Sequence, residues 1–390
     1  MSQLLESRWS ETKEALLEGL QGNKRSVMAS TLENTRKYLA ESATAGATSA
    51  GNVATLNRVI LPVIRRVMPT VIANELVGVQ PMTGPVGQIH TLRVRYADTF
   101  SGSTGGSTTA GEEALSPFKI AEGYSGVTPG KPAATAALEG VAGNKLSIQI
   151  LKQTVEAKTR KLSARWTFEA AQDAQAQQGI DIEAEIMAAL AQEITAEIDQ
   201  EVLRSLATLA SGARNTVAYD QAAVSGTATF VGDEHAALAV AINRVANTIA
   251  QRTRRGAGNW AVVSPTALTI LQSATTSAFA RTTEGTFEAP TNTKMVGTLN
   301  SAMKIYVNTY AGDNTVLVGY KGTSESDAAA FYCPYIPLMS SGVVLDPATF
   351  EPVVSFMTRY GYVELTNTAS SLGNAADYLG QVTIANASFT

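Results

Sequence analysis

The chain has 390 residues, 45% of them hydrophobic, so it can bury a sizeable core and is long enough for two or three domains. Its formal net charge of -4 lacks the basic excess of proteins that hold nucleic-acid phosphates tightly. The chain has no apolar run near the roughly 18 residues of a membrane-spanning helix and no signal-peptide core at its start, so we expect a protein made and used in a cytoplasm, with no membrane partner.

Two segments precede the main body of the chain. Residues 1–41 carry apolar side chains near helical spacing with charges between them, which predicts a helix. Residues 42–52, SATAGATSAGN, are small and predict a flexible linker. A second apolar stretch, 53–77, contains two prolines that break or cap its helices. We therefore expect a separable N-terminal segment followed by a joint that can be cut.

The segment GVQPMTGPVGQIHTLRVRY (78–96) begins with glycines and prolines, which interrupt regular structure, and ends with a run typical of an extended strand. The alternation of apolar and polar residues at its end predicts a strand with one solvated face. Residues 98–145 are rich in small residues and predict an exposed tip, and a second alternating run, 146–170, predicts a returning strand. Because a free hairpin is only marginally stable in water, we expect this long hairpin to lie on another surface, such as that of a neighbouring subunit.

The strongest helix is predicted over residues 181–211. Asp181 is a good N-cap, and Glu183 and Glu185 place negative charge near the positive helix end. Apolar residues recur at every fourth position from 182 to 206, and such a stripe drifts by about 40° per step in a helix of 3.6 residues per turn. We expect a long helix whose apolar stripe winds around it and contacts different elements along its length.

The remaining elements are mixed in order. We expect a helix over 233–255, then a strand, a turn at Ser264–Pro265 and another helix. Further strands are expected at 303–309, 315–321, 328–338 and 352–365. This order lacks the regular alternation of a parallel-sheet enzyme, which favours an α+β fold. The single cysteine, Cys333, lies in an apolar aromatic run and is expected to be a buried structural thiol.

The sequence offers no constellation for catalysis, a cofactor or a metal. Its two histidines, His90 and His235, have no third ligand nearby and no nucleophile elbow to serve. RRGAGNW (254–260) has glycines at 256 and 258 but no third glycine in step, so a helix-to-strand turn explains them better than a phosphate loop. We predict no catalytic, cofactor-binding or metal-ligating residue.

Charged residues on and near the long helix have a different expected use. Its carboxylates, Glu197 among them, are typical of a solvated helix face, although they also suit basic partners from neighbouring copies. Arg65 and Arg66, together with Arg160 and Lys161 in a basic run, are the candidates for such partners. These five residues are therefore the candidate contacts between subunits, with ordinary solvation as the alternative.

Seven short sequence motifs follow one another along the chain in a distinctive order. They are RRVMPTVIANELVGVQPM (65–82), GQIHTLRVRY (87–96), VEAKTRKLSARW (155–166), QDAQAQQGIDIEAEI (172–186), RGAGNW (255–260), VLVGYKGTSESDAAAFYCPYIPL (316–338) and FEPVVSFMTRYGY (350–362). In wording and order, the chain resembles the major capsid proteins of T-even-type tailed phages over most of residues 53–365. Each motif is short, but their shared order makes the resemblance specific.

The resemblance implies an α+β HK97-type capsid fold. In this fold a peripheral domain carries a long spine helix, an axial domain lies near the local symmetry axis, and an extended hairpin, the E-loop, lies across the next subunit. The expected parts are an N-terminal helical segment (1–41), an N-arm with the entry to the body (42–85), an E-loop hairpin (86–168) with a flexible tip (98–145), a peripheral domain (169–212 and 341–390) and an axial domain (213–340).

The chain departs from the T-even pattern in one large way. Those proteins carry an additional domain inserted in the E-loop region, whereas the corresponding stretch here, 98–145, is short and low in hydrophobic residues. We expect this stretch to be either a mere tip or a small ordered flap.

The function that the resemblance implies is structural, with no enzymatic activity. Copies would form hexamers, with pentamers left open, that close into an icosahedral shell around double-stranded DNA without sequence-specific binding. The protein would be assembled in the host cytoplasm and reside in the virion. Besides further copies, the implied partners are a vertex capsid protein, a portal, a scaffold, a prohead protease and decoration proteins. The alternatives are the pentameric vertex protein of the same family, an encapsulin-like compartment shell, and a soluble hydrolase that uses helix carboxylates.

The family also implies maturation by proteolysis. A phage protease removes the N-terminal segment after Leu or Ile, any residue, and Glu. The tripeptide LAE at 39–41 fits this rule just before the expected linker, and the other matches lie at 4–6, 16–18 and 120–122. Glu41 and Ser42 are therefore the candidate processing site, and residues 1–41 are expected to act during assembly.

Overall fold

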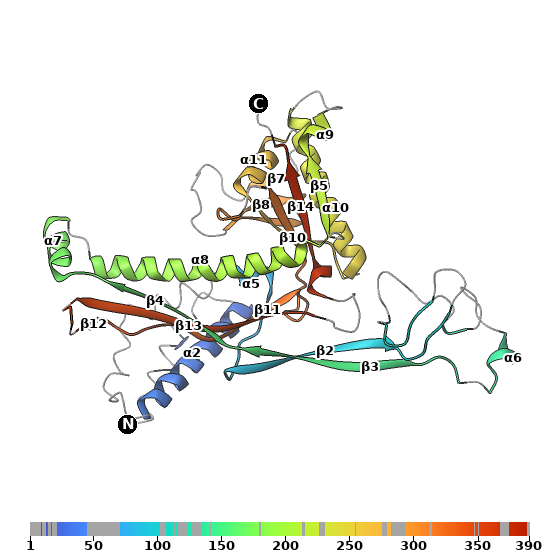
Figure 1. The fold of residues 1–390 in the computed structure, drawn as a ribbon, viewed down its shortest axis with the longest axis horizontal. Helices are drawn as coiled ribbons and strands as arrows, with labels where there is room; N and C mark the ends of the chain where they lie inside the picture. Colours follow the sequence, from blue (N-terminus) through green and yellow to red (C-terminus); the bar gives the residue numbers. More distant parts are fainter. Residues whose placement is uncertain are drawn as a thin grey trace. The chain divides into compact units, whose positions relative to one another are not determined.

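The computed structural model describes most of the chain (Figure 1). The described residues are 9, 13–14, 17, 22–44, 71–101, 107–112, 114, 124–126, 134–140, 142–178, 181–212, 215–225, 231–253, 255–274, 279–281, 294–311, 314–346, 348–349, 351–366 and 374–387. For residues 35–44 the backbone alone is described. The chain divides into two compact units. Residues 1–87, 155–203 and 331–363 contribute to the first, and residues 88–154, 204–330 and 364–390 contribute to the second.

The first unit is built on a five-stranded sheet. Its strands are β1 (Gly78–Val79), β4 (Lys158–Arg165), β11 (Ala330–Ser340), β12 (Val344–Leu345) and β13 (Pro352–Glu364). They follow the order β1-β11-β13-β12, and β4 also pairs with β13, antiparallel from Val353↔Arg165 to Tyr360↔Lys158. Strand β13 alternates as a strand with one buried face should, because Val354, Phe356 and Thr358 are buried.

Among the described residues, four helices belong wholly or mostly to the first unit. They are α2 (Gly22–Thr44), α5 (Ala73–Leu76), α7 (Phe168–Gln178) and α8 (Ile182–Ala210), whose last turns belong to the second unit. The long helix is confirmed close to its predicted bounds. As expected, Asp181 caps it, since its Oδ1 accepts a hydrogen bond from the backbone N of Glu183 at 3.1 Å.

The buried face of α8 turns along the helix in the predicted way. Buried residues occur as adjacent pairs at every fourth position: 190/191, 194/195, 198/199 and 202/203. A step of four advances the face by about 40°, so it winds by about 120° over these three steps. The winding begins later than predicted, because Ile182 and Ile186 are only partly buried.

The N-terminal segment differs from the prediction at its end. Helix α2 continues through Glu41 and Ser42 to Thr44, where the linker was expected to have begun. The rest of that expected linker, 45–52, lies outside the described residues. The candidate processing site is thus helical here.

The second unit holds a seven-stranded sheet. In sheet order its strands are β5 (Thr216–Asp220), β14 (Leu379–Ala385), β10 (Thr315–Gly319), β6 (Trp260–Val263), β9 (Met303–Val307), β8 (Lys294–Leu299) and β7 (Phe279–Arg281). Its helices are α6 (Thr135–Leu138), α9 (Gln221–Ser225), α10 (Val231–Thr253), α11 (Pro265–Ser273) and the 3-10 turn η1 (Ala375–Tyr378).

Helix α10 supplies much of the core of this sheet. Its buried residues Leu238, Ile242, Val245 and Ile249 recur at steps of three and four and belong to one cluster with the sheet residues. The predicted strand, turn and helix after it are confirmed. Ser264 ends β6 and caps α11, because its Oγ accepts a hydrogen bond from Ala267 N at 3.2 Å, and Pro265 occupies the first turn.

The predicted hairpin is present but shorter than expected. Strands β2 (Val86–Tyr96) and β3 (Leu146–Glu156) form a two-stranded sheet. The returning strand was predicted to continue to 170, but it breaks at Ala157, whose backbone N bonds Pro85 O at 2.9 Å. Beyond this point the chain pairs with β13 as β4, so long-range pairing decides where the hairpin ends.

The described part of the tip contains a small packed cluster. Tyr96, Ala114 and Tyr124 are buried together, and the two tyrosine rings lie 4.6 Å apart between centroids. Tyr124 Oη also donates to Lys145 O at 2.6 Å. Of the two expectations for 98–145, these contacts favour an ordered flap.

Two expected domain boundaries do not hold. Residues 341–390 were assigned together with the long helix, but β14 lies between β5 and β10 in the seven-stranded sheet. Strand β11 was assigned to the axial part, but it pairs with β13 and, in parallel, with β1. The buried residues Val382 and Ile384 explain the first difference, because they lie two positions apart on one face of β14 and complete the core of the second unit.

Candidate assembly surfaces

A charged network ties α8 to the sheet of the first unit. Arg160 on β4 donates from Nη1 to Glu197 at 2.8 Å, from Nη2 to Glu201 at 2.6 Å and from Nε to the Tyr360 hydroxyl at 2.6 Å. Tyr360 in turn donates to Glu201. One planar guanidinium thus serves three acceptors on two other elements, a task that suits arginine and not lysine.

The pKa values in this network follow from burial and charge. Burial alone would lower the pKa of Arg160, but hydrogen bonds to Glu201 and Tyr360 outweigh it and raise that pKa. Burial alone would raise the pKa of Glu201, but its bonds from Arg160 and Tyr360 lower it. Burial raises the pKa of Tyr360, and its hydrogen bond to Glu201 adds to the effect. Both shifts favour the ionised forms of Arg160 and Glu201.

The structure brings together two of the five predicted contact residues. Arg160 and Glu197 pair within one chain, and their contact with a neighbouring subunit stays a prediction. Lys161 is exposed on β4, whereas Arg65 and Arg66 lie outside the described residues. Sequence reasoning missed Tyr360 and did not choose Glu201, although the spacing of four from Glu197 places both carboxylates on one helix face.

Another carboxylate of α8, that of Asp199, is buried. It is 1% exposed, and its Oδ1 accepts a hydrogen bond from Ile72 N at 2.8 Å. Its Oδ2 is buried with no hydrogen-bond partner among the described residues. Burial raises the pKa of Asp199 to about 7, although the bond from Ile72 N works in the opposite direction. This side chain joins α8 to the start of α5 at the cost of burying an acid.

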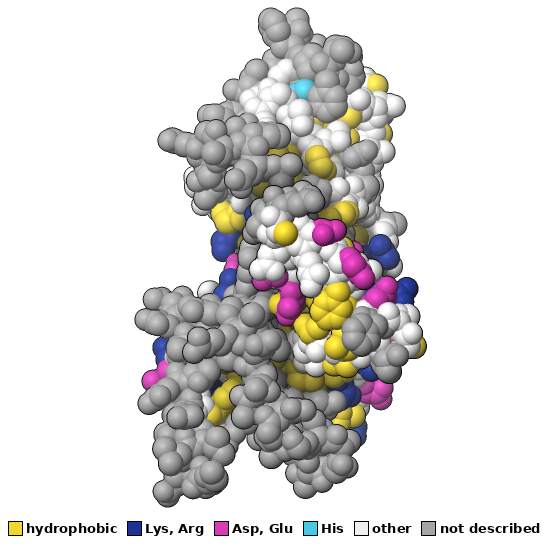
Figure 2. All heavy atoms as spheres, turned by 90° about the vertical axis from the view of Figure 1, so that its left-hand side faces the viewer, with side chains coloured by type: hydrophobic (Ala, Val, Ile, Leu, Met, Phe, Trp, Pro, Cys, Tyr) yellow, Lys and Arg dark blue, Asp and Glu magenta, His cyan; other side chains and the backbone are white. Residues whose placement is uncertain are grey.

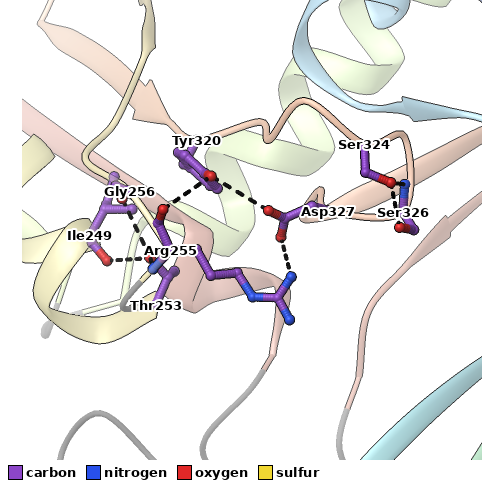
Figure 3. A network of polar contacts seen from close by, with 8 residues as sticks. All are labelled: Ile249, Thr253, Arg255, Gly256, Tyr320, Ser324, Ser326 and Asp327. Carbon is purple, nitrogen blue, oxygen red and sulfur yellow. Dashed lines mark hydrogen bonds and ion pairs between the residues drawn. The ribbon is translucent and has the colours of Figure 1, made fainter.

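A polar network in the second unit joins two of the motifs quoted above (Figure 3). Asp327 accepts hydrogen bonds from Arg255 Nη1 at 2.7 Å and from the Tyr320 hydroxyl at 3.4 Å. Thr253, at the end of α10, donates to Ile249 O at 2.9 Å. Arg255 opens RGAGNW, while Tyr320 and Asp327 belong to the motif at 316–338, so the network fixes the turn after α10 to the loop after β10.

The glycines of RGAGNW serve this turn, as predicted. A side chain on Gly256 would come within 2.6 Å of the Tyr320 ring, and one on Gly258 within 2.9 Å of Val318. The chain passes so close to β10 that only a hydrogen atom fits at either position. Close packing explains these glycines without a phosphate ligand.

The described histidine and cysteine side chains that could take part in catalysis or metal binding lie in structural positions. The described residues contain no cluster of three His, Cys, Asp or Glu that could hold a metal. Buried His235 has its Nδ1 2.6 Å from Ser273 Oγ. Cys333 is 2% exposed, and burial raises its pKa to about 11, which confirms the predicted inert thiol. No described helix is long and apolar enough to cross a membrane.

Apolar side chains are exposed on one face of the hairpin. Leu146, Ile148 and Ile150 alternate along β3 and are 56%, 69% and 67% exposed. Three more exposed apolar residues, Val343, Val344 and Leu345, lie at and beside β12 in the first unit. Scattered apolar residues are normal on a surface, but consecutive ones on one face of a ribbon indicate a surface that another molecule covers.

The charged side chains of the described surface are mixed in sign. On the face drawn in Figure 2, basic and acidic side chains lie interspersed among neutral and apolar ones. This agrees with the small net charge and differs from the basic groove or stripe of a protein that tracks a nucleic-acid backbone.

Comparison with known proteins decides the family. The sequence profile described as major capsid protein Gp23 matches residues 53–384. The chain belongs to the Gp23 family of major capsid proteins. The major capsid protein of Vibrio phage KVP40 is 30% identical over 84% of this chain and 80% of that protein. The major capsid protein of Enterobacteria phage T4 is 30% identical over 83% and 78%.

The structural comparison gives weaker likenesses. One is to the solved capsid of Myoviridae phage XM1, with 11% identity and a TM-score of 0.45 over 80% of this chain and 91% of that chain.

Gp23 membership confirms the resemblance, and with it the structural, non-enzymatic class and a place in the virion capsid. Helix α2 lies outside the matched residues.

Replacing Arg160 with alanine should lower the free energy of unfolding by about 1–2 kcal/mol, because Glu201 and Tyr360 lose a charged donor in a partly shielded place. The effect stays modest because the Glu197 and Glu201 side chains are 44% and 39% exposed. Denaturant unfolding measures it. Arg165→Ala is the matched control on the same strand, since that side chain is 70% exposed and lies 3.9 Å from Glu351. Equal losses for both variants would contradict the network.

Replacing Asp199 with asparagine should flatten the dependence of stability on pH. The folded pKa of Asp199, about 7, lies above its ordinary 3.8, so its contribution to stability is full below pH 4 and is lost as pH rises to 7. At about 1.4 kcal/mol per pKa unit, the loss is at most about 4 kcal/mol. Unfolding measured from pH 4 to 8 tests this. The exposed Glu193→Gln on the same helix should keep the wild-type slope, and an unchanged slope in Asp199→Asn would rule out the assignment.

Proposed function

We propose that the chain is a shell-building subunit whose copies form hexamers that close into an icosahedral shell around double-stranded DNA. Membership in the Gp23 family gives the class. The observation that carries the mode of assembly is the exposed apolar face of Leu146, Ile148 and Ile150 on a two-stranded ribbon. Such a ribbon is marginally stable by itself, and a neighbouring subunit that covers this face supplies the missing burial.

In this proposal the parts take the roles of an HK97-type fold. The β2–β3 hairpin is the E-loop, α8 is the spine helix of the peripheral domain, and the seven-stranded sheet is the axial domain. Residues 42–85 form the N-arm. Arg65, Arg66, Arg160, Lys161 and Glu197 remain the proposed contacts with neighbouring subunits; of the described ones, Lys161 and Glu197 are exposed and Arg160 is partly buried.

The genome and the other virion proteins fit the same proposal. A net charge of -4 and a surface of mixed sign suit a shell that encloses double-stranded DNA without reading its sequence. The vertex capsid protein, portal, scaffold, prohead protease and decoration proteins are proposed partners through the family role. Particle mass tests the role itself: hundreds of copies per shell support the hexamer protein, and a few tens would assign the chain to the vertices.

Changing Ile148 and Ile150 together to threonine should abolish closed shells and leave soluble subunits or small oligomers. Threonine keeps the strand preference of a β-branched residue but removes apolar area from the face that a neighbour covers. Negative-stain electron microscopy with particle-mass determination measures the outcome.

The matched control for the hairpin test is Gln149→Asn on the opposite face of the same strand, which should assemble as wild type. Normal shells from the double threonine variant would mean that this face is not an assembly contact.

We also propose that Glu41–Ser42 is cut during maturation. The tripeptide LAE ends within the last turn of α2, where a helix frays most readily and can present an extended chain to a protease. Intact-mass analysis of shell protein should find Ser42 as the N-terminus, and Glu41→Gln should retain Met1 or Ser2. Glu18→Gln, in another matching tripeptide, should leave the cut unchanged. Wild-type virions with an intact N-terminus would sink the proposal.

A further inference from the structure

Helix α2 makes specific contacts although it lies outside the residues that the Gp23 profile matches. Its buried residues Val27, Met28, Thr31 and Leu32 are 4% exposed or less and share one helix face. Lys24 pairs with Glu75 of α5 at 2.6 Å. This helix is therefore packed into the first unit along a face and is more than a leader attached by its end.

A buried polar contact of α2 is made to backbone carbonyls. Asn34 is 8% exposed, and its Nδ2 donates to Met82 O at 2.7 Å and to Tyr335 O at 3.0 Å. Both hydrogens of one amide are thus used to hold two chain segments, the loop after β1 and strand β11. A backbone target cannot be removed by changing a neighbouring side chain, so the contact depends on Asn34 itself.

Met82 lies at the root of the hairpin, by which we mean residues 82–87, where β2 begins, and 155–157, where β3 ends. Its N bonds Pro334 O at 3.0 Å, next to the residue that accepts from Asn34. An added Cβ would lie 3.6 Å from the Met82 side chain at Gly87 and 3.4 Å from it at Gly361. The Met82 side chain therefore packs against the start of β2 and against β13, while Asn34 donates to the Met82 backbone carbonyl.

We propose that α2 is a detachable clamp that holds the root of the β2–β3 hairpin against β11. With α2 docked, Asn34 fastens Met82 to Tyr335, and the root has little freedom. When α2 leaves, the two carbonyls lose their shared donor, and the root loosens. The proposal concerns the root alone, but its use in assembly rests on the proposed function, in which the hairpin reaches a neighbouring subunit.

Covalent linkage decides whether the clamp stays on. While α2 is part of the chain, its effective concentration at the docking surface is of the order of millimolar, so weak contacts suffice. A cut at Glu41–Ser42 separates Asn34 from the body and removes that advantage. The clamp is then held by its own affinity and dissociates on dilution.

Hydrogen exchange of the unassembled full-length chain tests the clamp without requiring shells. Asn34→Asp replaces two donors by an acceptor group that faces two carbonyl oxygens. Backbone amides of 82–87 and 155–157 should exchange about tenfold faster in this variant, while those of β6 and β10 keep their rates. Ser30→Ala is the matched control on α2, because Ser30 bonds Ser26 O within the helix at 3.0 Å, and it should leave the root unchanged.

A cut in the folded chain tests the same point without a destabilising substitution. A site-specific protease sequence placed within 45–52 allows α2 to be severed after folding, and its loss is followed by native mass. Faster exchange at the root after α2 dissociates supports the clamp. Unchanged exchange at the root with α2 gone overturns it, and so does an α2 that stays bound at nanomolar protein. If Asn34→Asp also loosens β6 and β10, the severed chain decides. Neither test measures shell formation, so a result that overturns the clamp proposal would leave the assembly proposal unaffected.

Discussion

The pairing of β4 with β13 beneath α8 is the interaction on which the first unit depends. Strand β13 places Val354, Phe356 and Tyr360 on one buried face, and the Tyr360 hydroxyl accepts from Arg160, so one strand carries both apolar and polar contacts. Eight consecutive residue pairs fix the register of β4, and a shift by one residue would turn Arg160 away from Glu197 and Glu201. The position of α8 on the sheet follows from that register.

The same pairing explains what the sequence could and could not predict. Local signals found α8, its cap at Asp181, and the strand, turn and helix around Ser264. They also found β9, β10, β11 and β13 close to their true bounds. The hydrophobic pattern and end signals of those elements can be recognised within a window of about ten to twenty residues. The end of β3 could not be found in this way, because the alternating pattern continues into β4 without a break. Only the partner strand, nearly 200 residues away, separates the two.

Long-range pairing also explains the misplaced boundaries. Strand β14 was not predicted, and nothing in residues 379–385 indicates that they insert between β5 and β10. The parallel pairing of β1 with β11 also has no recognisable sequence signal, because β1 has only two residues. At the site, the charges of Arg160 and Glu197 were visible, but their mutual pairing was not. Tyr360 looked like one more residue of an apolar strand until its hydroxyl was placed beside Glu201.

Several polar side chains of the first unit, buried or partly buried, lie at joints between separate chain segments. Asp199 joins α8 to the start of α5, Asn34 joins α2 to the loop after β1 and to β11, and Arg160 joins β4 to α8. Apolar packing tolerates many arrangements of neighbouring elements, whereas a directional hydrogen bond to one atom selects one of them. Such groups add little net stability after desolvation, so their placement at joints is better explained by the arrangement that they specify.

The distribution of apolar surface leads to a last consequence for assembly. Burying three large aliphatic side chains is worth several kcal/mol per copy, less than the entropy lost when two free proteins associate. A hairpin docked on one neighbour therefore cannot by itself hold two subunits together at low concentration. In the proposed closed ring, each copy would both give and receive a hairpin, and the other contacts of the ring would already limit the freedom of its members. If the proposed assembly holds, the exposed face of β3 is too weak to drive premature pairing of single chains, yet strong enough to stabilise a ring once several copies have met.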